Sequence, residues 1–213
     1  DKKENIIITS QKVTYFKNRE FIFSEGQSQA INEDIIIDAD NFEYNRITNV
    51  INASGNVKID NKNENYLIYT NNATYLKNEE LFLTKGQSQA INEDIIIDAD
   101  NFEYNRITNV INASGNVKID NKNENYLIYT NNATYLKNEE LFLTKGQSQA
   151  INEDIIIDAD NFEYNRITNV INTNGNVKIK DPINDYLILA DEATYYKNIE
   201  EIITNGDTEA FIQ

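Results

Sequence analysis

Paired aspartates are the residues of this chain whose types and spacing could do chemistry. The pair occurs three times, as Asp38 and Asp40, Asp98 and Asp100, and Asp158 and Asp160. Two carboxylates can serve as the acid and base of a glycosidase, and carboxylate oxygens also bind Ca²⁺. Calcium, however, takes about six to eight oxygens that converge from a loop, whereas these aspartates alternate with Ile and Ala. We therefore interpret them as residues on the solvated face of a strand and expect no metal site.

Other catalytic chemistry is restricted by composition. The 213 residues include no His and no Cys, which excludes catalysis by either residue as well as disulfide bonds. Composition alone leaves open a carboxylate-pair hydrolase on a β-solenoid. A catalytic pair repeated identically along one chain would make little sense, because an enzyme gathers one set of reactive groups in one cleft. We expect no enzyme activity, no catalytic residues and no cofactor.

Charge and hydropathy restrict the partners. The 19 basic and 35 acidic residues give a formal net charge of −16, which argues against binding to the phosphate backbone of a nucleic acid. No apolar run approaches the roughly 20 residues that a membrane-spanning helix requires. The chain begins at Asp1 rather than Met, and we expect it to be trimmed or processed.

The dominant feature of the sequence is repetition. Residues 26–85 are identical to 86–145 at all 60 positions, and 146–172 repeat the first 27 residues again. Seven glycines recur at alternating spacings of 29 and 31 residues, each with a tyrosine eleven positions earlier. An isoleucine lies seven positions before each tyrosine. The unit I-x6-Y-x6-[IF]-x3-G therefore occurs seven times, and such regularity is typical of a protein built by stacking.

Each unit carries the signals of β-strands. Short runs of Ile, Val, Tyr, Phe and Thr are separated by Asn, Asp and Gly, and no window sustains helical spacing. Apolar residues occupy odd positions from Ile35 to Ala39 and even positions from Phe42 to Tyr44. This slip of one position predicts a β-bulge near Asp40–Asn41.

The glycines and the polar segments divide the strands. Single glycines at fixed places predict bends or bulges, and the segments at 60–65 and 120–125, "DNKNEN", predict turns. A unit of about 30 residues cannot bury its apolar face alone, so neighbouring units must stack. We predict one all-β domain over residues 1–213, an elongated stack of about seven repeats of 28–32 residues. Either a jellyroll or a flattened solenoid with an apolar interior fits this pattern.

The recurring segment "IIIDADNFEYNRITNVINASGNVKI" resembles the OstA-like family of lipopolysaccharide transport. The shared pattern is I-x-A-D-x-x-x-Y, a short apolar strand, and then A-x-G-N-V-x-I. Its sharpest pieces lie at 53–59, 113–119 and 173–179, and the resemblance covers nearly the whole chain. The family comprises the periplasmic bridge protein and the N-terminal domain of the outer-membrane translocon.

This resemblance implies both a fold and a function. The fold would be a twisted, semi-open β-jellyroll whose apolar groove conducts the acyl chains of lipopolysaccharide, or of a similar acylated lipid, across the periplasm. The location would be periplasmic, with a link to the outer membrane. The partners would be other β-jellyroll domains bound end to end, including head-to-tail copies of this chain, which open strand edges near 6–9 and 209–213 also favour.

The residues expected to bind acyl chains are apolar or aromatic and recur in register. They are Ile37, Phe42, Tyr44, Ile51, Val57, Ile68, Tyr75, Phe82, Ile97, Phe102, Tyr104, Ile111, Val117, Ile128, Tyr135, Phe142, Ile157, Phe162 and Tyr164. The sequence shows no basic cluster that would hold lipid phosphates, so we expect binding to depend mainly on the acyl chains.

Two alternatives stay open. The complete identity of the repeats is unlike a natural family member and indicates an engineered, repeat-extended protein, which could be a purely structural scaffold without lipid transport. The tyrosine column, correspondingly, either lines a lipid groove or forms an aromatic ladder that holds a sealed core together.

Overall fold

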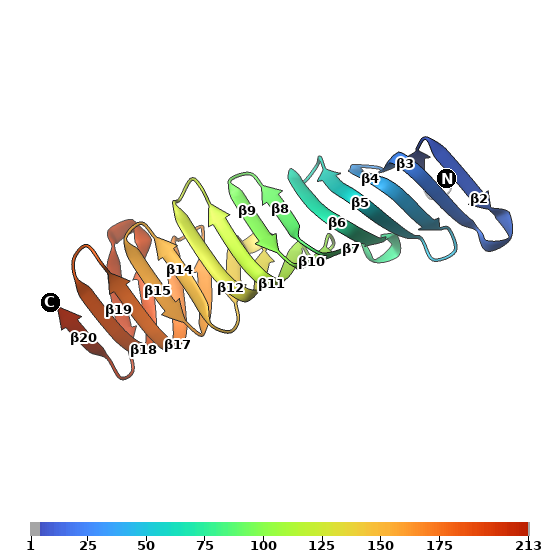
Figure 1. Ribbon diagram of the computed structural model, residues 1–213. Coiled ribbons are helices and arrows are strands. Elements are labelled where there is room, and N and C mark those ends of the chain that lie inside the picture. The colour runs from blue at the N-terminus through green and yellow to red at the C-terminus, as the bar shows by residue number, and fades with distance from the viewer. Residues whose placement is uncertain (1–4, 213) are drawn as a thin grey trace. The chain divides into compact units, whose positions relative to one another are not determined.

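The computed structural model describes residues 5–212, and its strands pair in antiparallel fashion within each of two compact units. The first unit ends at Thr108 and the second begins at Asn109. Figure 1 shows the strands and the short connections between them. The all-β class and the repeated strand pattern expected from the sequence are confirmed, whereas a single domain over 1–213 stays a prediction.

The first unit contains ten strands and two short 3₁₀ turns. The strands are β1 (Ile6–Thr9), β2 (Lys12–Phe16), β3 (Phe21–Asn32), β4 (Ile35–Asn45), β5 (Val50–Asn61), β6 (Tyr66–Leu76), β7 (Leu81–Lys85), β8 (Ser88–Asn92), β9 (Ile95–Ala99) and β10 (Asn101–Asn105). The 3₁₀ turns are Lys17–Arg19 and Lys77–Glu79.

The second unit also contains ten strands and two 3₁₀ turns. The strands are β11 (Val110–Asn121), β12 (Tyr126–Leu136), β13 (Leu141–Thr144), β14 (Ser148–Asn152), β15 (Ile155–Ala159), β16 (Asn161–Asn165), β17 (Val170–Asp181), β18 (Tyr186–Tyr196), β19 (Glu201–Asn205) and β20 (Glu209–Ile212). The 3₁₀ turns are Lys137–Glu139 and Lys197–Ile199.

A bend in each long strand divides the sheet of a unit into two layers. In β4 the pairing with β5 shifts register between Asp38 and Asn41, so the bulge expected near Asp40–Asn41 is confirmed. Residues on one side of the bend form the isoleucine layer, which contains Ile37, and those on the other side form the tyrosine layer, which contains Tyr44. The six residues between Ile and Tyr in the sequence unit therefore carry the chain from one layer to the other.

The glycines occupy bends with a positive φ, as expected, and a side chain would be obstructed at Gly55 although not at Gly146. Gly55 lies in β5 at φ +76°, and a Cβ added there would come within 2.3 Å of Asp40 Oδ2. The next residue, Asn56, also has a positive φ of 48°, and its Nδ2 donates to Asp40 Oδ2 at 3.0 Å. The pairing of β5 with β6 shifts register between Ser54 and Val57 at this point.

Asparagines close the turns of the isoleucine layer. Asn61 Oδ1 accepts hydrogen bonds from the backbone N–H groups of Asn63 and Glu64, both at 3.1 Å. The same arrangement recurs at Asn121, so the turns expected at 60–65 and 120–125 are confirmed. In this way each turn projects a glutamate, Glu64 or Glu124, from the end of the layer.

The core lies between the two layers, and its side chains are apolar within each layer and polar near the bend. Ile59 and Ile68 in the isoleucine layer, and Phe82 in the tyrosine layer, have no exposed surface. Near the bend a row of hydroxyl groups replaces the apolar side chains, with Ser88 Oγ 2.7 Å from Thr84 Oγ1 and 2.9 Å from Thr70 Oγ1. Within residues 5–212, no helix is long and apolar enough to cross a membrane.

Candidate functional site

The residues expected to bind acyl chains all lie in the interiors of the two units. Each of them is at most 4% exposed. Those of the first unit are Ile37, Phe42, Tyr44, Ile51, Val57, Ile68, Tyr75, Phe82, Ile97, Phe102 and Tyr104, and those of the second are Ile111, Val117, Ile128, Tyr135, Phe142, Ile157, Phe162 and Tyr164. In each unit they line the facing sides of the two layers, where they are shielded from solvent.

Aromatic contacts fill much of this interior. The rings of Tyr75 and Phe82 stack within the tyrosine layer at 4.2 Å between centroids. Tyr66, which comes from the isoleucine layer, meets Tyr104 of the tyrosine layer edge to face at 4.7 Å. The second unit repeats both contacts, with Tyr135 on Phe142 at 4.2 Å and Tyr126 on Tyr164 at 4.5 Å.

The hydroxyl groups of the tyrosine column reach the side of the unit opposite the bend. There the turns of the tyrosine layer and the turns of the isoleucine layer face each other, and we call this side of the unit the mouth. Tyr75 donates to Glu80 Oε2 at 2.9 Å on its own side of the mouth, and Tyr104 donates across the mouth to Glu64. Each ring is therefore part of the core, while its hydroxyl belongs to a polar edge.

An ion-pair network bridges the mouth of the first unit. Arg106, just after β10, places its guanidinium Nη2 3.0 Å from Asp34 Oδ2 in the facing turn, and it also pairs with Glu80 beside it. The side chains of Arg106 and Asp34 are only 15% and 16% exposed. We call Asp34, Glu64, Glu80, Tyr104 and Arg106 the clasp of the first unit.

The clasp has the electrostatics of a partly buried polar network. Burial raises the pKa of Tyr104, and its neighbours Tyr66 and Glu64 raise it further, so the phenol stays protonated as a donor. Burial by itself lowers the pKa of Arg106, but the charges of Glu80 and Asp34 outweigh this effect and raise the pKa overall. Arg106 is therefore a permanent cation.

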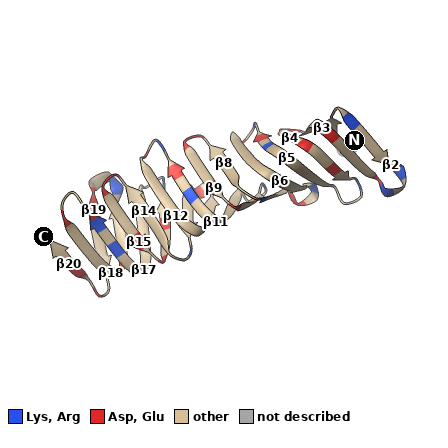
Figure 2. Ribbon diagram, in the orientation of Figure 1, with Lys and Arg blue, Asp and Glu red and all other residues tan. Residues whose placement is uncertain are grey.

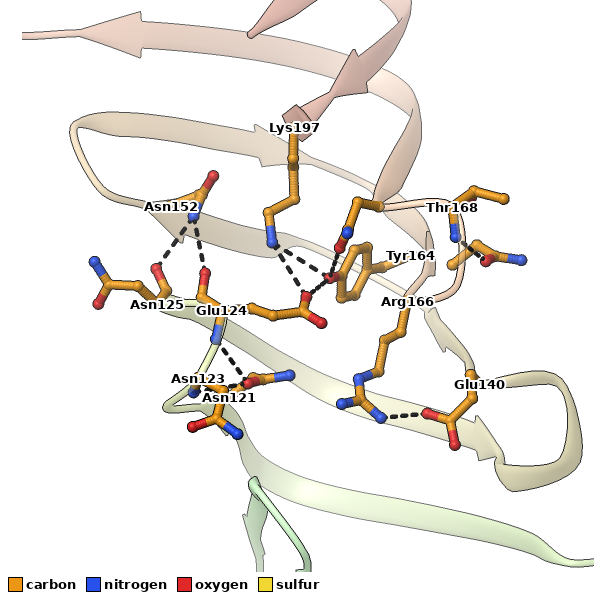
Figure 3. A network of polar contacts seen from close by, with 12 residues as sticks. Asn121, Asn123, Glu124, Asn125, Glu140, Asn152, Tyr164, Arg166, Thr168 and Lys197 are labelled. Carbon is orange, nitrogen blue, oxygen red and sulfur yellow. Dashed lines mark hydrogen bonds and ion pairs between the residues drawn. The ribbon is translucent and has the colours of Figure 1, made fainter. Parts of the chain in front are cut away.

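The second unit has its own clasp, which consists of Glu124, Tyr164 and Lys197 and is drawn in Figure 3. Glu124 comes from the turn after β11, and it accepts a hydrogen bond from Tyr164 and lies 3.4 Å from Lys197 Nζ across the mouth. Lys197 is 8% exposed and lies over the rings of Tyr126 and Tyr164, at 4.7 and 5.1 Å from their centroids. Burial lowers the pKa of Lys197, while Glu124 opposes that change.

The paired aspartates are separated rather than convergent. Asp38 accepts a hydrogen bond from Gln29 Nε2 at 2.7 Å, on the outward side of the isoleucine layer. Asp40 lies at the bend, where it holds Asn56. Among the described residues, no group of three or more His, Cys, Asp or Glu side chains could hold a metal ion.

The sequence did not predict the clasp, nor some of the residues that line the interior. Ile59, Tyr66, Ile119 and Tyr126 belong to the same interior and are at most 2% exposed, and their alternation with polar residues was a usable signal. Arg106 follows the column residue Tyr104 by two positions, which places it just beyond the strand end. Its partner Asp34 is 72 residues away, and no local pattern joins the two.

The comparisons with known proteins show the fold. Neither a protein-family profile nor a curated protein sequence matches the chain. Among solved structures, the chain is similar to LptH of Pseudomonas aeruginosa, described as the LptA-homologous periplasmic component of the lipopolysaccharide transport device. The TM-score is 0.50 at 12% sequence identity, over 54% of this chain and 85% of that chain. The strand architecture is thus a β-jellyroll of the LptH type, as expected from the sequence.

Proposed function

We propose that the protein binds lipopolysaccharide, or a similar acylated lipid, by its acyl chains and conducts it as part of a periplasmic export bridge. The observation that carries this proposal is the interior of each unit, where two apolar layers face each other and are joined along the mouth by side-chain contacts. The jellyroll that it shares with LptH supports the same class of ligand. The proposal implies a periplasmic location.

The interior is chemically suited to acyl chains. Facing rows of Ile, Val, Phe and Tyr side chains make up most of the buried residues where a hydrocarbon chain would lie, and the buried polar residues are Ser, Thr and Asn side chains together with Asp181 at the end of β17. Burying each methylene contributes about 0.8 kcal/mol, so a chain of about twelve carbons supplies on the order of 10 kcal/mol before ordering costs. Part of that energy must replace the contacts that the interior side chains make with one another.

End-to-end assembly follows from the strands that terminate the two units. Within residues 5–212, the pairings of β1 and β2 are with β3, and those of β19 and β20 are with β18. Tyr15 of β2 is 46% exposed, whereas Tyr75 at the matching position of an internal repeat is 1% exposed. Ile203 of β19 and Phe211 of β20 are also about half exposed, at 50% and 47%. These edges suit strand addition by another jellyroll.

Charge favours head-to-tail contact between copies of this chain. Lys12 is the only charged residue of β1 and β2, whereas β19 and β20 carry Glu201 and Glu209 and no basic residue. Figure 2 shows the basic residues on β2 and in the turn after it. Lys12 pairs with Glu25 of β3 at 2.6 Å, and contact with Glu201 and Glu209 of another copy would give it further acidic partners, which supports a heterologous interface.

The alternative is a structural scaffold that binds no lipid. It is favoured by the low exposure of the interior, at most 4% at every residue expected to bind lipid, and by the 60-residue identity of the repeats. On this alternative the two layers stay closed and the aromatic contacts act only in stability.

A substitution test with a matched control separates the two functions. Ile37, Ile97 and Ile157 face the interior, and the preceding Ile36, Ile96 and Ile156 face outward on the same strands. Replacing the inward set with Asn should abolish retention of lipopolysaccharide in native mass spectrometry, whereas the outward set should leave it intact. Circular dichroism checks that both variants fold.

A second measurement does not depend on polar substitutions in the core. The chain contains no Trp, so Phe82→Trp reports the interior and Tyr69→Trp reports the outer face. Lipids with brominated acyl chains should quench the first tryptophan and leave the second unchanged. A parent protein that retains no lipid, together with no selective quenching, would establish the scaffold function instead.

A further inference from the structure

The clasp lies across the side of each unit through which a lipid would enter. On the opposite side the two layers are continuous, because β3, β4, β5 and β6 each run through the bend from one layer to the other. Parting the layers there would require breaking strands, and the row of hydroxyl contacts at Thr70, Thr84 and Ser88 adds to that closure. The mouth is the side that can open without such a loss.

The contacts described across the mouth of the first unit are made by side chains. Asp34 reaches Arg106 and Glu64 reaches Tyr104 from facing turns, while the turns within each layer are linked by backbone hydrogen bonds, such as Arg106 N to Glu80 O at 3.0 Å. Backbone hydrogen bonds therefore hold together the turns of one layer. The contacts described between the turns of the two layers are made by side chains, and water can replace them. In the second unit Glu124 meets Lys197 and Tyr164 in the same manner.

We infer that the two clasps are gates that admit the lipid sideways through the mouth, an inference that rests on the proposed function. Release of Asp34 from Arg106, and of Glu124 from Lys197, separates the two rows of turns and exposes the interior. Closure behind the acyl chains restores the same contacts and keeps water out of the apolar layers. The sugar and phosphate groups of the lipid stay outside, beyond the clasp.

The chemistry of the clasp suits repeated opening. The charged groups of the first clasp are partly exposed already, whereas Lys197 of the second is nearly buried. On opening, these groups exchange protein partners for water, so that no ion is left without solvation. Arg106 Nε is buried without a hydrogen-bond partner when the clasp is closed, and water would satisfy it on opening. An apolar seam would resist opening more, because it would expose hydrocarbon surface on both rows.

Thiol cross-linking tests this inference directly, since the chain has no cysteine of its own. Asp34→Cys with Arg106→Cys, and Glu124→Cys with Lys197→Cys, place one thiol on each side of the mouth. A short bis-methanethiosulfonate reagent links each pair through disulfides that a reductant cleaves. The control pair, Gln29→Cys with Asp38→Cys, joins neighbouring residues on the outer face of the isoleucine layer.

The readout is the rate at which quenching by bromo-acyl lipopolysaccharide develops in Phe82→Trp for the first unit and Phe142→Trp for the second. With the clasp pairs linked we expect no quenching above a blank, with recovery after reductant in the same sample. The unlinked clasp variants should take up lipid several-fold faster than the parent, because the gate is weakened, and the linked control should match the parent.

The outcomes distinguish the gate from the proposed function. Uptake at the parental rate through linked clasps would overturn the gate and leave lipid binding in place. An absence of quenching in the parent protein and in every unlinked variant would overturn the proposed function, and the gate with it. Failure to recover after reductant would show that the linked protein had misfolded. The single variants Asp34→Asn and Glu124→Gln then decide: lipid uptake faster than that of the parent supports the gate, and uptake at the parental rate overturns it.

Discussion

At the scale of the residue, tyrosine rather than phenylalanine occupies the repeated column because each position requires both an apolar ring and a polar tip. The ring of Tyr104 has no exposed surface, while its hydroxyl donates to Glu64 at the mouth. Tyr195 is similarly placed, and its hydroxyl lies 3.4 Å from Asn152 Oδ1. A phenylalanine would retain the packing and leave the carboxylate or amide of the facing turn without this donor.

Buried tyrosines predict a loss of stability in alkali. Burial raises the pKa of Tyr66, Tyr104 and Tyr126, and it raises the pKa of Tyr195 to about 12. Unfolded tyrosines ionise near pH 10, so above that pH the unfolded state loses protons that the folded state keeps. The free energy of unfolding should therefore be at its full value below about pH 10 and fall as pH rises beyond it.

Urea unfolding followed by circular dichroism between pH 8 and pH 11.5 measures this dependence. The phenolate absorbance of the buried tyrosines should appear together with unfolding rather than before it. In Tyr104→Phe the free energy of unfolding should fall less with rising pH than in Tyr69→Phe, because Tyr69 is 40% exposed on the outer face. A stability that is unchanged across pH 10 would contradict the expectation.

At the scale of the element, the bend in each long strand sets the position of the two layers. Left-handed residues at Gly55 and Asn56, together with Asp40 on the neighbouring strand, turn β5 from the tyrosine layer into the isoleucine layer. The bend lets one strand present Ile51 from the tyrosine layer and Ile59 from the isoleucine layer to the same interior, on either side of the register shift. Without it a strand would continue past the core.

A pair of glycine substitutions separates the two reasons why a bend requires glycine, which are the left-handed backbone and the lack of space for a Cβ. Gly55 and Gly146 have φ of +76° and +80°, but a Cβ at Gly55 would meet Asp40 Oδ2 at 2.3 Å, whereas at Gly146 nothing lies within 4 Å. Gly146→Ala should cost about 1 to 2 kcal/mol from the left-handed backbone alone. Gly55→Ala should cost about 1 kcal/mol more, because Asp40 must move and release Asn56.

The measurement is the free energy of unfolding from urea titration of both variants and the parent. The m-value serves as the control, because it should stay constant if the extent of the folded structure is unchanged. Equal losses for the two variants would mean that Asp40 adapts without cost and that backbone strain alone explains the glycines.

At the scale of the whole molecule, the open strand edges predict association. We expect concentration-dependent, head-to-tail oligomers in light scattering, in which β19 and β20 of one copy meet β1 and β2 of another. Lys12→Glu should weaken them, and adding Glu201→Lys and Glu209→Lys should restore them, because the charges are then exchanged between the two ends. Monomers throughout, or a charge-exchanged variant that does not recover, would rule out this interface.

Much of the architecture could be predicted from the sequence because its causes are local and repeated. Alternating apolar residues, a slip of one position at Asp40–Asn41 and glycines in register specify strands, bulges and bends whichever neighbour the strand has. The burial of Ile37, Tyr44 and their copies follows from the same alternation, since one face of a strand must be covered. The lipid role of these residues stays a prediction, because burial alone does not distinguish a groove from a core.

Only the tertiary structure decided how the interior is closed. The bend folds the sheet of a unit so that turns distant in the sequence face each other, and this brings Asp34 to Arg106 across 72 residues and Glu124 to Lys197 across 73. In the sequence these charges are indistinguishable from other acidic and basic residues of polar turns. Their role depends on which turns meet across the mouth, and that is fixed by the packing of the two layers rather than by any local preference of the chain.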